Sequence, residues 1–124
     1  MAMSKLIRIL IADDSSIMRR LITQTLNLES CLEVVGAAKD GAEAITYFET
    51  QQPDVVLLDM DMPKGNGLAA LKAIRELDPI IPVIMLGSFS AGNDAALRTA
   101  IAAGATDCVC KPAGTGHQIG RAHV

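Results

Sequence analysis

The sequence contains no tryptophan, one tyrosine and two phenylalanines among 124 residues, although half of its residues are hydrophobic. A core must therefore be built from aliphatic side chains and methionine. No apolar run approaches the roughly 20 residues needed to cross a bilayer. The first residues, Met1 to Lys5, lack the cleavage pattern of a signal peptide. These absences exclude a membrane-spanning protein and predict a cytoplasmic location.

Cysteine is also scarce, with only Cys31, Cys108 and Cys110. Three is an odd number, and no cluster of histidines accompanies them. Cys108 and Cys110 fall in a strand-like run, where alternation would place both side chains on one face. We expect buried free thiols rather than a metal or redox site.

Charge of one sign is not in excess, because the net charge is −3 and acidic and basic residues are interspersed. This pattern does not favour a nucleic-acid or membrane partner. The length is typical of one domain. We expect a single domain over residues 1–124, with its core at about 6–112.

Five short apolar runs alternate with segments of helical periodicity. The expected strands are Leu6–Ala12, Leu32–Ala38, Val55–Leu58, Pro82–Leu86 and Thr106–Cys110. Runs this short, apolar on both sides, are typical of buried parallel strands. The alternation predicts an α/β fold, a parallel sheet with helices on both faces.

The expected helices follow from caps and breakers. Asp14 or Ser15 can cap the first helix, and Asp40-Gly41 opens the second. The third is expected after a glycine-rich loop at residues 64–67, and the fourth from about Asn93 to a closing Gly104.

Charged residues follow several of the strands at their carboxyl ends. Asp13 and Asp14 follow the first strand, Asp59 the third, and Lys111 the fifth; Gly87-Ser88 ends the fourth. Right-handed crossovers bring these ends to one edge of a parallel sheet. Clustered carboxylates repel one another unless a cation lies among them, and Mg²⁺ binds a few carboxylates while leaving positions for phosphate. Together with a lysine, these are the groups that phosphoryl transfer uses. The alternative is that each acid is only a cap or a turn residue.

These residues give the sequence a resemblance to the receiver domains of two-component response regulators. The resemblance rests on Asp13-Asp14, Asp59, Met62-Pro63, Gly67 and Lys111-Pro112, in that order, and it extends from about Leu6 to Pro112. It implies a flavodoxin-like, five-stranded parallel sheet in the order 2-1-3-4-5. It also implies a phosphoacceptor domain that is not itself an enzyme, with any catalytic output domain lying outside this chain.

The resemblance further implies a role for each matching residue. Asp59 would accept a phosphoryl group from a sensor histidine kinase or a phosphotransfer protein. Asp14, Asp59 and the backbone carbonyl of Asp61 would bind Mg²⁺, with Asp13 assisting through water. Lys111 would pair with the phosphoryl oxygens, and the Lys111–Pro112 peptide bond would be cis.

Within the family, the stretch from Ser88 to Pro112 and the opening Asp13-Asp14-Ser15-Ser16-Ile17-Met18-Arg19 resemble the receivers of chemotaxis methylesterases. Three features depart from the family pattern. Gly87 stands where the family has Thr or Ser, with Ser88 one residue later, and Cys108 replaces an aromatic residue of the fifth strand. We therefore expect an intact acceptor site with a weakened conformational switch.

The third departure is the end of the chain. Residues 113–124 contain three glycines and almost no apolar periodicity. We expect the family's fifth helix to be missing or incomplete, and this tail to be truncated or non-native.

Two other classes of protein stay open at this point. The stretch Leu57–Asp61 also resembles the first motif of haloacid-dehalogenase-type phosphatases, in which two aspartates serve as nucleophile and general acid. Those enzymes carry this motif on their first strand, which argues against them here. The other alternative is a pseudo-receiver, a protein-interaction module that does not signal through phosphate.

Overall fold

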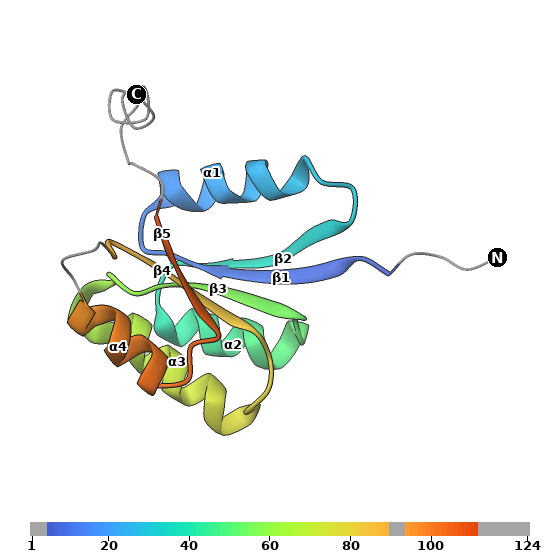
Figure 1. Cartoon of the computed structure of the whole chain (residues 1–124). Helices are drawn as coiled ribbons and strands as arrows, with labels where there is room; N and C mark the ends of the chain where they lie inside the picture. Colours follow the sequence, from blue (N-terminus) through green and yellow to red (C-terminus); the bar gives the residue numbers. More distant parts are fainter. Residues whose placement is uncertain (1–4, 90–93, 112–124) are drawn as a thin grey trace, which may run out of the picture.

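The computed structural model describes residues 5–89 and 94–111. Its five strands are β1 (Ile7–Ala12), β2 (Leu32–Ala38), β3 (Val55–Asp59), β4 (Val83–Gly87) and β5 (Asp107–Cys110). They pair in parallel, in the order β2-β1-β3-β4-β5 (Figure 1). The predicted fold class and strand order are confirmed.

Four α-helices connect the described strands: α1 (Ser16–Asn27), α2 (Gly41–Gln51), α3 (Asn66–Leu77) and α4 (Asp94–Ala102). Ser15 caps α1 through its hydroxyl, which accepts a hydrogen bond from the N–H of Met18. Asp40 caps α2 by accepting one from the N–H of Glu43. The predicted caps are thus confirmed, with Ser15 rather than Asp14 at the first helix. The predicted start of the fourth helix at Asn93 lies outside the described residues.

The start of α3 corrects one prediction. Asn66 and Gly67, expected in a glycine-rich loop, belong to the helix, which follows a short 3₁₀ turn at Pro63–Gly65. The chain reverses at Lys64, whose φ of 60° lies in the left-handed region. Because the turn is complete at Gly65, Asn66 and Gly67 are already free to be helical.

Side chains that alternate along the strands pack into two separate hydrophobic clusters, one on each face of the sheet. On one face, α1 covers a cluster that includes Ile9, Ile11 and Ile22. On the other face, α2, α3 and α4 cover the larger cluster, which contains Leu10, Val56 and Leu58. Of the helices in the described part of the chain, Figure 1 shows α1 on one side of the sheet and α2, α3 and α4 on the opposite side.

The coverage of the sheet is uneven at β5. This edge strand leaves Val109 45% exposed, and its neighbour Cys108 packs toward the larger cluster. By alternation, Val109 faces the side of α1. Residues 112–124, where a fifth helix or a tail was expected, lie outside the described part of the chain.

The expectation of buried thiols is wrong for two of the three cysteines. All three are free, but Cys31 and Cys110 are exposed and Cys108 is half-buried. Cys31 lies in the turn before β2, and Cys110 ends an edge strand, so both lie at the periphery of the sheet. Over residues 5–89 and 94–111, no helix is both long enough and apolar enough to cross a membrane.

Candidate functional site

The predicted site residues lie at the carboxyl ends of β1, β3 and β5, where sheet hydrogen bonding continues past the strand ends. The continuing N–H···O contacts are Asp13 to Ala38 at 3.0 Å, Met60 to Leu86 at 2.7 Å and Lys111 to Gly87 at 2.9 Å. The backbone on which the charged side chains sit is therefore held by the sheet itself. The spacing of these residues is therefore set by backbone hydrogen bonds and not by contacts between their side chains.

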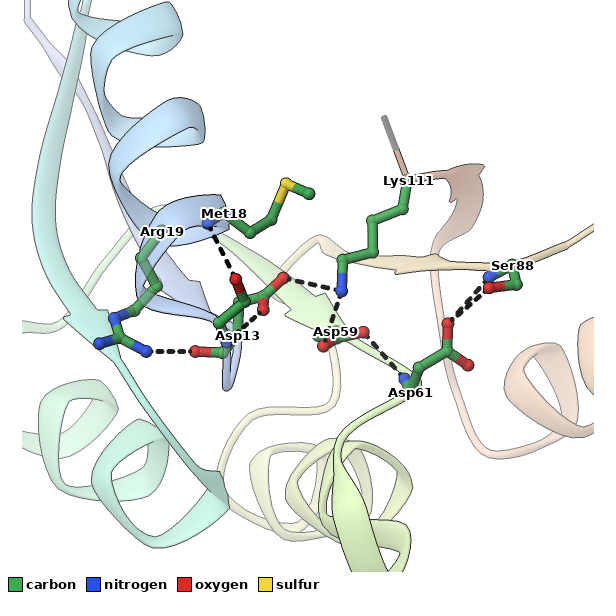
Figure 2. A network of polar contacts seen from close by, with 8 residues as sticks. Asp13, Met18, Arg19, Asp59, Asp61, Ser88 and Lys111 are labelled. Carbon is green, nitrogen blue, oxygen red and sulfur yellow. Dashed lines mark hydrogen bonds and ion pairs between the residues drawn. The ribbon is translucent and has the colours of Figure 1, made fainter. Parts of the chain in front are cut away.

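Lys111 joins the two buried acids (Figure 2). Its Nζ lies 3.0 Å from Oδ2 of Asp59 and 3.1 Å from Oδ2 of Asp13. Both carboxylates are 0% exposed, whereas the lysine side chain is 19% exposed. One ammonium group therefore faces two buried carboxylates, which leaves the trio with a net negative charge.

The other oxygens of these acids have backbone donors. Oδ1 of Asp13 accepts from the N–H of Ser15 at 2.8 Å, and Oδ1 of Asp59 accepts from the N–H of Asp61 at 2.9 Å. Oδ2 of Asp13 differs, since it is buried and accepts no hydrogen bond from the described residues. Among the described residues, the charged partner of this oxygen is the ammonium of Lys111, 3.1 Å away. This oxygen keeps spare capacity for a positively charged ligand or for water.

Burial raises the pKa of Asp59, and the charge of nearby Asp13 acts in the same direction. The N–H of Asp61 and the ammonium of Lys111 oppose this without cancelling it. For Lys111, burial by itself would lower the pKa, but the contacts with Asp59 and Asp13 raise it above its ordinary value. The lysine therefore stays charged at neutral pH, while the carboxylate of Asp59 is held in an environment that resists its ionisation.

A third acid completes the cluster. Asp14 is exposed, and one carboxylate oxygen from each of Asp13, Asp14 and Asp59 lies within 4.8 Å of the others. Oxygen ligands at this spacing suit Mg²⁺. With the underused Oδ2 of Asp13 beside it, this donor set fits a divalent cation. The backbone carbonyl of Asp61 as a further ligand stays a prediction.

Gly67 explains how α3 reaches the site. A Cβ at this position would collide with the carbonyl oxygen of Asp59 and press on Met60. Only glycine allows the first turn of α3 to lie against the backbone at the end of β3.

At the end of β4, an aromatic ring lies against the buried Gly87. A Cβ at residue 87 would stand 3.1 Å from Cε2 of Phe89 and 3.2 Å from Cβ of Met60. No pattern in the sequence indicated that Phe89 would lie here, since a residue in a loop carries no periodic signal.

Ser88 meets the carboxylate of Asp61. Its N–H and its hydroxyl each lie 3.0 Å from Oδ2 of Asp61 (Figure 2). The resemblance to receiver domains implied only a backbone role for Asp61 and gave no indication of this side-chain contact. The Asp-x-Asp pattern at residues 59–61 was the available signal, but it does not say where the second carboxylate points.

Comparisons with known proteins agree with this geometry. Residues 9–121 match the response regulator receiver domain family. The chain is 44% identical over 110 residues to a protein-glutamate methylesterase/protein-glutamine glutaminase of Dechloromonas aromatica, a match that covers 88% of this chain and 31% of that protein. The chain thus spans about a third of the length of the curated relatives it matches.

Solved structures show the same fold. The response regulator domain of Thermotoga maritima CheB is similar with a TM-score of 0.80 and 38% identity, over 89% of this chain and 81% of that one. A chain of the CheX-CheY-BeF3-Mg+2 complex of Borrelia burgdorferi is similar with a TM-score of 0.77 and 29% identity, over 93% and 85%. These matches favour the receiver over the haloacid-dehalogenase alternative.

Proposed function

We propose, because the chain belongs to the response regulator receiver domain family, that Asp59 is its phosphoacceptor. The observation that carries the proposal is the contact of a fully buried carboxylate with Lys111, beside the Asp13 and Asp14 carboxylates. Receiver domains interact with kinases or phosphotransfer proteins, so the donor would be a phosphohistidine of such a partner. A pseudo-receiver would have no need of a buried, like-charged cluster that costs stability.

The transfer moves one phosphoryl group between two side chains. An Asp59 oxygen forms a bond to phosphorus while the bond between phosphorus and the donor's imidazole nitrogen breaks. The electron pair of the broken bond stays on that nitrogen, and the imidazole leaves neutral once its protons are balanced with solvent. The product is an acyl phosphate on Asp59. Because Asp59 is 0% exposed, the side chains around it must move apart for the donor to reach it.

Mg²⁺ would be held by Asp14, Asp59 and the backbone carbonyl of Asp61, with Asp13 assisting through water. When bound, this ion supplies positive charge that offsets the charge on the transferring group. Asp13 meanwhile keeps Lys111 in place through its ion pair. Lys111 then remains beside the acceptor when the charge moves from the carboxylate onto the phosphoryl oxygens.

The proposal is tested by labelling with acetyl phosphate and Mg²⁺, followed by mass spectrometry of the intact protein. The parent should gain one phosphoryl group that is labile to acid and to base, and Asp59→Asn should gain none. Asp54→Asn is the matched control, because Asp54 is an exposed aspartate at the opposite end of the same strand. Undiminished labelling of Asp59→Asn would reject the assignment, and an unlabelled parent would favour the pseudo-receiver.

For the whole protein we propose a chemotaxis methylesterase in which this receiver controls an output domain outside the present chain. The support is the resemblance to full-length methylesterases, of which the chain matches only the receiver part. Three further statements stay predictions. They are the cytoplasmic location, the boundaries of the domain core at about residues 6–112, and the truncated or non-native character of residues 113–124. The native sequence that follows Lys111-Pro112 would test all of these except the location.

A further inference from the structure

The carboxylate of Asp61 ties the acceptor site to the loop after β4. Its N–H donates to Oδ1 of Asp59, and its Oδ2 accepts two hydrogen bonds from Ser88. A continuous chain of contacts therefore runs from Lys111 through Asp59 and Asp61 to Ser88, as Figure 2 shows. Ser88 is 27 residues away from Asp61 in sequence, so this contact is tertiary rather than local.

Both donors of this contact meet one oxygen of a charged group. Hydrogen bonds to an ionised acceptor are about twice as strong as neutral ones. The N–H bond involves the backbone of Ser88, so the contact holds the path of the loop as well as a side chain. In this conformation the hydroxyl of Ser88 is turned toward Asp61.

The contact between Ser88 and Asp61 matters because the neighbouring residue, Gly87, has no side chain. Residue 87 has no side chain to respond to a group on Asp59, and the ring of Phe89 lies close by, 3.1 Å from where a Cβ at this position would stand. The Sγ of Cys110 also donates to the carbonyl of Phe89 at 2.7 Å, which links the loop to β5. Ser88 is therefore the nearest hydroxyl-bearing residue to the end of β4 in sequence.

We propose that the Asp61 carboxylate is an autoinhibitory contact that holds the loop after β4 in its resting position. A phosphoryl group on Asp59 would gain the two donors of Ser88 only by taking them from Asp61. This second step rests on the proposed function, whereas the resting contact does not.

The exchange has a physical consequence for signalling. In this exchange the N–H and the hydroxyl of Ser88 pass from one anionic acceptor to another, so the gain is the difference between these two acceptors. Only that difference can shift the loop between states. Repulsion between the Asp61 carboxylate and a new phosphoryl anion favours release, because like charges at short range destabilise each other. The contact thus sets the threshold for the response of this loop.

The resting contact is tested without any phosphodonor, by NMR of the Ser88 amide. In Asp61→Ala, exchange of this amide with solvent should be about tenfold faster or more, because a charge-assisted hydrogen bond is lost. Asp61→Asn, which keeps an acceptor oxygen but not the charge, should give an intermediate rate. Glu76→Ala is the matched control, since it removes an exposed acid of α3 and should leave the rate unchanged.

The second step is tested with beryllofluoride and Mg²⁺ as a phosphoryl mimic. In the resting Asp61→Ala protein, the amide signals of residues 86–89 should already be displaced toward their positions in the ligand-bound parent. If Ser88 exchanges at the same rate in Asp61→Ala, Asp61→Asn and Glu76→Ala, the contact is absent in solution and the inference is overturned. If the resting signals move in another direction, the autoinhibitory role is overturned. Failure of the parent to take up acetyl phosphate would overturn the proposed function alone, because the amide exchange is measured without a phosphodonor.

Discussion

Nζ of Lys111 lies 3.0 Å from Oδ2 of Asp59, although 52 residues separate them in sequence. In the sheet, β4 stands between the strands that carry these residues, so the lysine side chain reaches across the end of β4. The same ammonium group also pairs with Asp13 at the end of β1. A single cation therefore connects the ends of three strands.

Replacement of Asp14 should have opposite effects on stability without metal and on the stabilisation that Mg²⁺ gives. Asp14 is the exposed member of the acidic cluster, so Asp14→Ala should relieve repulsion and slightly raise the melting temperature without metal. It should also lose the rise in melting temperature that Mg²⁺ gives the parent. Thermal unfolding with and without Mg²⁺ measures both effects, with Glu76→Ala as control. An equal Mg²⁺-dependent rise in Asp14→Ala and the parent would place the metal elsewhere.

The raised pKa of Asp59 predicts a specific pH dependence of stability. Because the pKa of Asp59 in the folded protein lies above the ordinary value of 3.8, the folded protein binds this proton more tightly than the unfolded chain does. Ionisation of Asp59 therefore destabilises the fold at neutral pH, and this penalty disappears as the pH falls through the folded pKa toward 3.8. Asp59→Asn should be more stable than the parent at pH 7, with a difference that shrinks toward pH 4.

Urea denaturation of the parent, Asp59→Asn and Asp54→Asn at several pH values checks this dependence. Asp54 is exposed, so its replacement should not show the same convergence. A constant difference between Asp59→Asn and the parent across this range would argue that burial does not govern the charge of Asp59.

A hydroxyl at residue 87 should strengthen the response to phosphorylation. In Gly87→Thr the new hydroxyl can donate to phosphoryl oxygens, a charge-assisted bond worth roughly 1.5–3 kcal/mol that exists only in the phosphorylated state. The ring of Phe89, 3.1 Å from the new Cβ, must yield by a few tenths of an ångström. With beryllofluoride and Mg²⁺, the parent should show a weak change of NMR shifts in α4, and Gly87→Thr a larger one. Gly87→Ala, which adds the Cβ without the hydroxyl, should behave like the parent; an equal gain in Gly87→Ala would show that bulk rather than hydrogen bonding matters.

The exposed apolar side of β5 should limit the stability of this chain. Val109 is 45% exposed and Leu21 of α1 is 39% exposed, so apolar surface remains uncovered on the α1 side of the sheet. Burial of one Leu-sized side chain contributes roughly 1.5–3 kcal/mol, against a net domain stability of about 5–15 kcal/mol. We expect the 124-residue chain to be marginally stable or to self-associate, and a native amphipathic helix added after Pro112 to raise its stability by several kcal/mol. Sedimentation measures self-association, and urea denaturation measures stability. A monomeric chain whose denaturation midpoint is unchanged by the added helix would contradict this prediction.

The local pattern of the sequence determined the elements and the edge at which the site forms. The apolar run Val55–Leu58 between two prolines could only be a short buried strand, and the acid that ends it had to lie at the edge where parallel strands finish. The same reasoning placed Asp13, Asp14 and Lys111 beside Asp59, because strand direction and right-handed crossovers depend on patterns that the sequence shows.

Tertiary structure alone decided how the side chains at that edge are used. Whether the carboxylate of Asp61 faces solvent or Ser88 depends on the path of a loop 27 residues away, which no periodicity records. The exposure of Cys31 and Cys110 likewise depends on which layers cover them, not on their own hydrophobicity. Secondary structure and topology follow from repeated local signals that reinforce one another. A single side-chain contact between loops depends instead on the packing of all the elements that bring the loops together.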